Sequence, residues 1–220
     1  MLVSHHSTVI RQGHPSDAAF LSWVVIESCL TAGHSGYWDL ILGRHRSKKE
    51  LARVIQQDIP HSLQCSSFRV MEVNGNPVAA VKHTLMEEVQ IQQMELLKLL
   101  GIGTWQEPQI ELAFKQVSSA FQQVTPEPVM NTLELEYLAV LPSFRRLGIA
   151  SKLIDDAINQ CSQHEAKNIS ILVSSKNHSA IKCYQRAGFL LQSKHKNKYF
   201  TQLTGHDGID FWLYNSVTSR

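Results

Sequence analysis

The chain has 220 residues, of which 43% are hydrophobic and 18% are charged, and its formal net charge is +2 at pH 7. This length suffices for one domain with a substantial core, or for one domain with an insertion. The composition excludes a disordered chain, the small net charge gives no reason to expect a nucleic-acid partner, and no apolar run reaches the roughly 18 residues of a membrane-spanning helix.

The first half of the chain predicts short strands and helices in alternation. Their expected positions are 8–11 (strand), 14–29 (helix), 37–42 (aromatic turn or short helix), 68–73 (strand) and 78–85 (strand). Gly43 ends the aromatic segment, and Ser47 to Glu50 has the pattern of a capping box, which predicts that a helix begins there. Asn74-Gly75 is typical of a tight hairpin between the last two strands.

Residues 87–124 form a long, glutamine-rich connection that is broken once at Gly101-Ile102-Gly103. Its second half has one apolar face at helical spacing, made of Ile110, Phe114, Val117, Phe121 and Val124. We therefore predict two inserted helices. They either pack on their own domain, roof a binding site, or form the contact of a homodimer.

Residues 143–150 lie between an apolar strand expected at 133–140 and an amphipathic helix expected at about 151–163. A basic turn of small residues at the start of a helix presents backbone N–H groups at the positive end of the helix dipole, and this arrangement holds phosphate groups. Gly148 permits a tight turn. The loop has neither a Gly-Lys-Ser/Thr ending nor a G-x-G-x-x-G pattern. An ordinary strand-to-helix turn is the alternative.

A second motif follows at Asn177 to Phe189, which predicts a short helix with Asn177 as its N-cap and Gly188 at its C′ position. The R-x-x-G-x-A pattern of residues 145–150 and the N-x-x-A-x-x-x-Y-x-x-x-G-F pattern of residues 177–189 together resemble the GCN5-related N-acetyltransferase (GNAT) superfamily. The resemblance is clearest from about Leu133 to Leu191.

The resemblance implies an α/β acyl-CoA N-acyltransferase (GNAT) fold, with a mixed, twisted sheet of about seven strands, helices on both faces and a helical insertion before the central strand. It implies one domain over residues 1–220, with the insertion at about 87–124. It also implies acetyl-CoA as the acetyl donor and a bulge near Leu138 in the central strand. The implied cofactor-binding residues are Leu138, Ala139, Val140, Arg145, Arg146, Leu147, Gly148, Ile149, Ala150, Ser151, Asn177 and Tyr184.

The resemblance further implies direct attack of a primary amine on acetyl-CoA, without a covalent enzyme intermediate. The amine must lose a proton, and alternation along the central strand places two candidate bases, Glu134 and Glu136, on one face. Both carboxylates could instead simply face solvent or pair with a neighbouring strand. Tyr184 is expected to reach the cofactor sulfur, where it would protonate the departing thiolate, although a packing role is the alternative. Cys183 should point elsewhere on its helix.

The acceptor is expected to be the primary amine of a small molecule, a peptide or a protein. Ribosomal-protein N-terminal acetyltransferases typically carry a glutamate on the strand before the second motif, and the strand expected at 169–173 has no acid. By resemblance, Trp23, Tyr37 and Trp38 belong to one wall of the acceptor site, and late loops including His206 belong to another. A non-catalytic acyl-CoA-binding or sensing module is the competing hypothesis, which would need the loop but neither glutamate nor Tyr184.

Metal and localisation are predicted from the sequence alone. The four cysteines, Cys29, Cys65, Cys161 and Cys183, form no C-x-x-C pair, which favours reduced intracellular thiols. The eleven histidines show no H-x-x-x-H spacing, so we expect no metal site. Residues 1–6 carry no secretory pattern, which predicts a cytoplasmic protein without a membrane partner.

Overall fold

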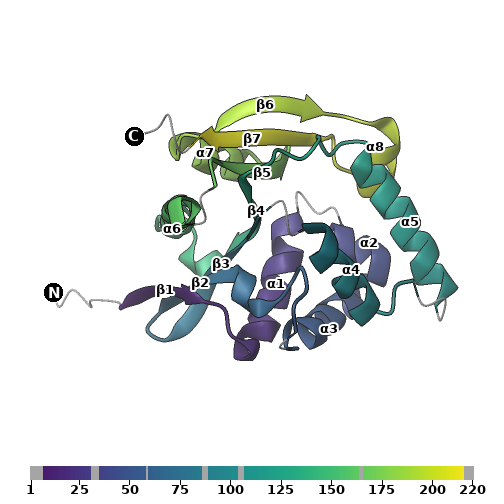
Figure 1. The fold of residues 1–220 in the computed structure, drawn as a ribbon, viewed down its shortest axis with the longest axis horizontal. Coiled ribbons are helices and arrows are strands. Elements are labelled where there is room, and N and C mark those ends of the chain that lie inside the picture. Colours follow the sequence, from purple (N-terminus) through teal and green to yellow (C-terminus); the bar gives the residue numbers. More distant parts are fainter. Residues whose placement is uncertain are drawn as a thin grey trace.

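The computed structural model describes residues 7–30, 35–57, 59–85, 89–103, 107–163 and 166–215. The described strands form one mixed sheet in the order β1-β2-β3-β4-β5-β7-β6 (Figure 1). Their bounds are Thr8–Gln12 (β1), Phe68–Val73 (β2), Asn76–Leu85 (β3), Thr132–Val140 (β4), Asn168–Ser174 (β5), Leu190–His195 (β6) and Ile209–Asn215 (β7). Only β4 and β5 pair in parallel; the other neighbours are antiparallel. The expected mixed seven-stranded sheet is confirmed.

The described α-helices are Ala18–Cys29 (α1), Tyr37–Leu42 (α2), Arg44–Ile55 (α3), Val89–Leu99 (α4), Pro108–Gln122 (α5), Ile149–Gln163 (α6), His178–Arg186 (α7) and Lys198–Thr204 (α8). The two inserted helices are thus confirmed as α4 and α5, on either side of the glycine break. The predicted hairpin is also present, because Asn74 and Gly75 both have positive φ (52° and 76°) between β2 and β3. Positive φ at both central residues is the backbone conformation that a type I′ hairpin turn requires.

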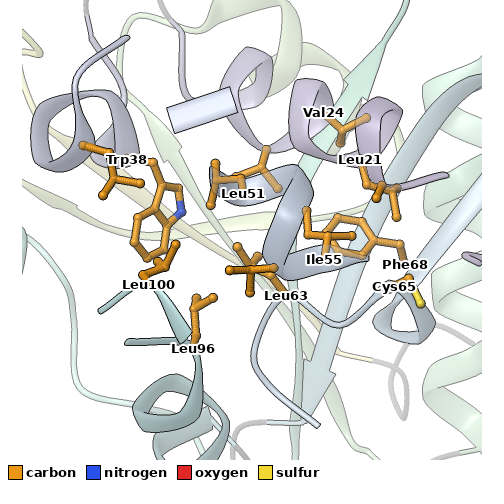
Figure 2. Close-up of a cluster of buried hydrophobic side chains, with 14 of the residues drawn as sticks. Leu21, Val24, Trp38, Leu51, Ile55, Leu63, Cys65, Phe68, Leu96 and Leu100 are labelled. Carbon is orange, nitrogen blue, oxygen red and sulfur yellow. The ribbon is translucent and has the colours of Figure 1, made fainter. Parts of the chain in front are cut away.

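Helices cover both faces of the sheet, as Figure 1 shows. On one face, apolar side chains of α6 and α7 pack against β2 to β5, with Leu153, Ile154 and Phe189 almost fully buried. On the other face, α1 to α5 form a second apolar cluster (Figure 2). Leu96 of α4 and Leu100, which follows this helix, lie in the second cluster together with Trp38 of α2. The insertion therefore packs on its own domain.

The middle of the sheet opens between β4 and β5. These strands pair only from Thr132 to Leu135 on β4, although β4 continues to Val140. The register between β3 and β4 shifts just beyond this point, so that Lys82 faces Glu136 whereas Ala80 faces Ala139. Two β4 residues, Tyr137 and Leu138, therefore stand opposite one residue of β3, and Tyr137 has a φ of +51°. This is a β-bulge, and it confirms the bulge expected near Leu138.

One local prediction needs correction, and one helix was not predicted. Ser47 does not cap a helix, since α3 already begins at Arg44 and the Ser47 backbone N–H donates to the carbonyl of Gly43. Its hydroxyl instead donates to Asp39 of α2, which satisfies it inside the helix. Helix α8 was not expected within the lysine-rich region, yet Asn197 caps it by accepting from the N–H groups of Tyr199 and Phe200.

Candidate active site

A cavity of about 350 Å³ lies where β4 and β5 diverge, and α1, α2, α4, α5, α7 and α8 contribute to its walls. Five of the residues predicted for the site line it together: Glu134, Glu136, Leu138, Asn177 and Tyr184. The divergence of the strands explains the cavity, because the unpaired ends leave the space between β4 and β5 unfilled by a ladder. The catalytic candidates from the central strand and from the second motif thus meet in one place.

Glu134 and Glu136 share one face of β4 and point into the cavity, but they have different partners. Glu136 forms an ion pair with Lys82 of β3, whose side chain is only 3% exposed. Lys82 also donates to the hydroxyl of Thr84, so its ammonium is held from two sides. Within the described residues, the carboxylate of Glu134 has no hydrogen bond or ion pair. The two glutamates therefore differ: Glu136 is held in an ion pair with Lys82, and Glu134 has no partner among the described residues.

The surroundings of Glu134 favour its protonated form. The pKa of Glu134 is raised to about 8, mainly because the carboxyl group is buried and to a smaller extent because of the nearby negative charge of Glu136, while Lys82 opposes both effects. With this pKa the Glu134 carboxyl keeps its proton at neutral pH. A cation that arrives beside it would favour the ionised form. Such a carboxyl group can take a proton from an ammonium that lies against it.

Tyr184 projects from α7 into the same cavity and is 7% exposed. Its ring lies 5.9 Å from that of Phe189, centroid to centroid, which fixes it against the sheet. Burial, and to a smaller extent the neighbouring Cys183, raises the pKa of the Tyr184 hydroxyl. The phenol thus keeps its proton at neutral pH and is able to donate a hydrogen bond.

Asn177 is the N-cap of α7, as predicted, because its side-chain oxygen accepts from the N–H of Ala180 at 3.2 Å. Gly188 follows the helix with a φ of +90°, the left-handed conformation expected at C′. These caps fix the ends of α7 and hence the direction of Tyr184. Asn177 also lines the cavity, so the capping role leaves its amide group within reach of a ligand.

The predicted phosphate loop lies outside the cavity, between β4 and α6. A short 3-10 helix at Pro142–Phe144 leads into it, and both Arg146 and Gly148 have positive φ (63° and 76°). A Cβ atom placed on Gly148 would meet nothing within 4 Å, so the space above the loop is open. The first N–H groups of α6 have no partners within the helix. Leu138 of β4 lines the cavity, and the strand continues from it to Val140, shortly before the loop begins.

Arg145 differs from the expectation of a free cationic donor. Its guanidinium donates to the carbonyl of Val140 at 3.0 Å and to the carboxylate of Glu27 at 2.8 Å. It therefore ties the loop to α1 in this structure. Arg146 is exposed and makes no ion pair among the described residues, so it remains the cation available to a ligand at the loop.

Two cysteines lie near the site, and neither has the environment of a nucleophile. Cys29 lines the cavity, but burial raises the pKa of its thiol to about 11, and a thiol is a poor nucleophile until it ionises. Cys183 points away from the cavity, with its sulfur 3.8 Å from the hydroxyl oxygen of Ser151 on α6. The prediction that Cys183 points elsewhere than Tyr184 is confirmed.

Several residues of the site were not singled out from the sequence. Lys82 was missed. The available signal was that it is a charged residue within the apolar run of β3, the strand that pairs with the central strand. Phe200 was missed because α8 was not predicted. The available signal for this helix was a short apolar segment with an asparagine before it and a glycine after it. Trp38 and His206 do line the same cavity, which the sequence could not establish. Trp23 is not among the lining residues.

Comparison with known proteins decides the family. Residues 45–189 match the family model described as "Acetyltransferase (GNAT) family", which is more than half of the chain.

The chain belongs to the GNAT acetyltransferase family.

A GNAT relative in Bacillus subtilis (strain 168), whose name marks it as a candidate ribosomal-protein alanine N-acetyltransferase, is 27% identical over 85 residues. The match covers 39% of this chain, and the chain spans only 55% of that relative's length. An N-acetyltransferase from Staphylococcus aureus Mu50 has a similar structure, with a TM-score of 0.63 at 17% identity over 94% of this chain and 100% of the other.

A candidate acetyltransferase from Salmonella typhimurium, solved with its cofactor acetyl-CoA, aligns with a TM-score of 0.52 at 16% identity over 95% of this GNAT chain and 94% of its own. At such identities, the structural likeness establishes the fold alone. In the described part of the GNAT chain, no three histidine, cysteine or acidic side chains are grouped so that they could hold a metal ion. No described helix is long and apolar enough to cross a membrane.

Proposed function

We propose that this GNAT protein transfers the acetyl group of acetyl-CoA to a primary amine in the cytoplasm, by direct attack and without a metal ion. The observation that carries the proposal is the convergence of Glu134, which has no partner among the described residues, and the buried Tyr184 in one cavity at the opening between β4 and β5. The Salmonella relative supports acetyl-CoA as the donor, since it was solved with that molecule.

In this proposal the N-terminus of α6 and the loop 145–151 bind the pyrophosphate of acetyl-CoA, with Gly148 leaving room for it and Arg146 supplying charge. Residues 138–140 hold the pantetheine arm, and Asn177 contacts its amide groups. The thioester then lies in the cavity beside Tyr184. A backbone N–H freed at the β4 bulge would stabilise the negative charge that develops on the thioester oxygen.

Glu134 is the proposed base, because Glu136 is already paired with Lys82 and Glu134 is not. The ammonium of the acceptor gives a proton to the Glu134 carboxylate, and the neutral amine attacks the carbonyl carbon. The C–N bond forms and the C–S bond breaks. Tyr184 gives its proton to the departing CoA sulfur, and the second proton passes from the nitrogen, through solvent, to the Tyr184 oxygen as the amide forms. The raised pKa of the Tyr184 hydroxyl keeps that proton in place until the thiolate appears.

The Bacillus relative raises the possibility of a ribosomal-protein acceptor, but the 85-residue match covers a minority of this chain. The strand β5, with the sequence Asn168–Ser174, carries no acid, unlike the strand typical of those enzymes. A peptide acceptor therefore receives less support than a small-molecule amine.

The test is an acetyl-transfer assay in which acetylated amines are detected by mass spectrometry, with Glu134→Gln as the variant. We expect transfer by the wild type and a loss of about 100-fold or more in kcat for Glu134→Gln, in the range of general-base catalysis. Binding of acetyl-CoA should be unchanged in the variant. Binding without any transfer by the wild type would support the non-catalytic module instead.

A further inference from the structure

Five rings that line the cavity contact one another in a chain, and we call them the aromatic arc: Trp38, Tyr37, Phe121, Phe200 and His206. Each ring contacts the next. The centroid distances are 5.0 Å from Trp38 to Tyr37, 5.1 Å from Tyr37 to Phe121, 5.1 Å from Phe121 to Phe200, and 6.2 Å from Phe200 to His206. The first three contacts are edge-to-face, which is a favoured arrangement for aromatic pairs.

The arc is fixed by elements that are far apart in the sequence. Tyr37 of α2 shares a hydrogen bond of 2.9 Å with Ser118 of α5, and Tyr199 of α8 donates to the carbonyl of Gln116 at 3.5 Å. Helices α5 and α8 also contact each other directly, as Figure 1 shows at the edge of the molecule. The inserted helix α5 thus holds one ring of the arc between two others, and the rings are arranged before any ligand binds.

The charged side chains that line the cavity are acidic. Its described lining residues include two acidic side chains, Glu134 and Glu136, and no lysine or arginine. Lys82, behind the lining, neutralises Glu136 through their ion pair. One carboxyl group, that of Glu134, is therefore left to balance one positive charge. The ligand that matches this arrangement carries a single ammonium next to a body that rings can pack against.

We propose that the acceptor is an arylalkyl monoamine, whose ammonium lies at Glu134 and whose ring packs against the aromatic arc. This inference rests on the proposed function and specifies its acceptor. A polyamine would bring a second ammonium among the rings without a second unpaired carboxylate. A free amino acid would bring a carboxylate into a lining that has no unpaired cation. A peptide N-terminus would bury amide groups against Phe121 and Phe200, whose rings cannot hydrogen-bond them.

The test compares four acceptors at saturating acetyl-CoA: 2-phenylethylamine, spermidine, phenylalanine, and a short peptide with a free alanine N-terminus. We expect kcat/KM for 2-phenylethylamine to exceed that for each of the others by at least about tenfold, since one well-placed contact with a buried ring or ammonium corresponds to that factor. Phenylalanine is the sharpest comparison, because it differs from 2-phenylethylamine only by its carboxylate.

Phe121→Leu removes one ring of the arc while it keeps an apolar side chain. It should raise KM for 2-phenylethylamine roughly 5- to 30-fold and leave KM for acetyl-CoA unchanged. Phe121→Tyr keeps the ring and should stay near the wild type. The matched control is Phe20→Leu, which removes a part-buried ring that stacks on Trp23 at 5.6 Å and does not line the cavity. This control should change neither KM.

The outcomes separate the inference from the proposed function. A preference for spermidine, phenylalanine or the peptide would overturn the inference and leave the acetyl-transfer proposal standing. An equal rise in KM for 2-phenylethylamine in Phe20→Leu and Phe121→Leu would also overturn it, because the effect would then be general loss of packing. Failure to bind acetyl-CoA, or failure to acetylate any of the four amines, would overturn both.

Discussion

The two glutamates of β4 should respond to neutralisation with opposite changes in stability. Glu134→Gln removes a carboxyl whose pKa burial raises from 4.5 to about 8. Such a group binds its proton more tightly in the folded state than in the unfolded state. It therefore costs nothing below pH 4.5, and it destabilises the fold increasingly as the pH rises from 4.5 towards 8. Removing it should relieve that cost.

The magnitude follows from the interval between the two pKa values. Each unit of difference between the two pKa values corresponds to about 1.4 kcal/mol. The whole interval therefore limits the destabilisation that Glu134 can cause to about 5 kcal/mol of unfolding free energy. Glu134 faces a cavity that water can enter, which lowers the cost of its charge. We expect Glu134→Gln to raise the unfolding free energy of the ligand-free protein by about 1–3 kcal/mol at pH 8.5, equivalent to roughly 3–10 °C in Tm. At pH 5 the gain should fall below about 1 kcal/mol.

Glu136→Gln is the matched control, two residues away on the same strand. It leaves the buried ammonium of Lys82 without its ion-pair partner. Breaking a fully buried pair costs about 3–5 kcal/mol, and because the Glu136 side chain is 31% exposed we expect a loss of about 1–3 kcal/mol. The assay is urea unfolding of both variants and the wild type at pH 5 and pH 8.5. If Glu134→Gln loses stability at pH 8.5, or if both variants change in the same direction, the assignment of paired and unpaired carboxyl groups is wrong.

The wild-type kcat/KM for an amine should rise with pH through about 8 as free Glu134 ionises, and Glu134→Gln should lack this rise in a pH–rate profile. Tyr184→Phe should lower kcat by about tenfold with an unchanged Kd for acetyl-CoA, since the departing thiol needs only modest acid assistance; a weaker Kd would instead indicate a packing role. Gly148→Val should abolish acetyl-CoA binding in a calorimetric titration. Gly43→Val, at a second left-handed glycine with open space above it, should bind normally, and equal losses would refute the phosphate-loop assignment.

Much of the fold was predictable from the sequence because the deciding signals were local. The hairpin at Asn74-Gly75, the cap at Asn177 and the glycine break in the insertion each depend on neighbouring residues alone, and all three are confirmed. The capping box at Ser47 failed for the opposite reason. Asp39, in a separate helix, supplies the partner that holds the Ser47 hydroxyl inside α3.

The candidate site was predictable where a motif names its residues, and not where tertiary contacts decide their state. Alternation placed Glu134 and Glu136 on one face, but only the register of β3 shows that Lys82 faces Glu136. The sequence therefore could not choose between the two carboxyl groups. The aromatic arc likewise joins residues from α2, α5 and α8, and no periodicity along the chain brings Phe121 to Phe200.

The central claim is that this GNAT protein binds acetyl-CoA, and a thermal-shift titration with acetyl-CoA, CoA and NAD in parallel tests it most directly. A ligand at about 100 times its dissociation constant stabilises the folded state by about 2.7 kcal/mol, which for a domain of this size corresponds to roughly 5–10 °C in Tm. We predict a shift of that size with acetyl-CoA and none with NAD. No shift with either CoA species would contradict the phosphate-loop assignment and the proposed function with it.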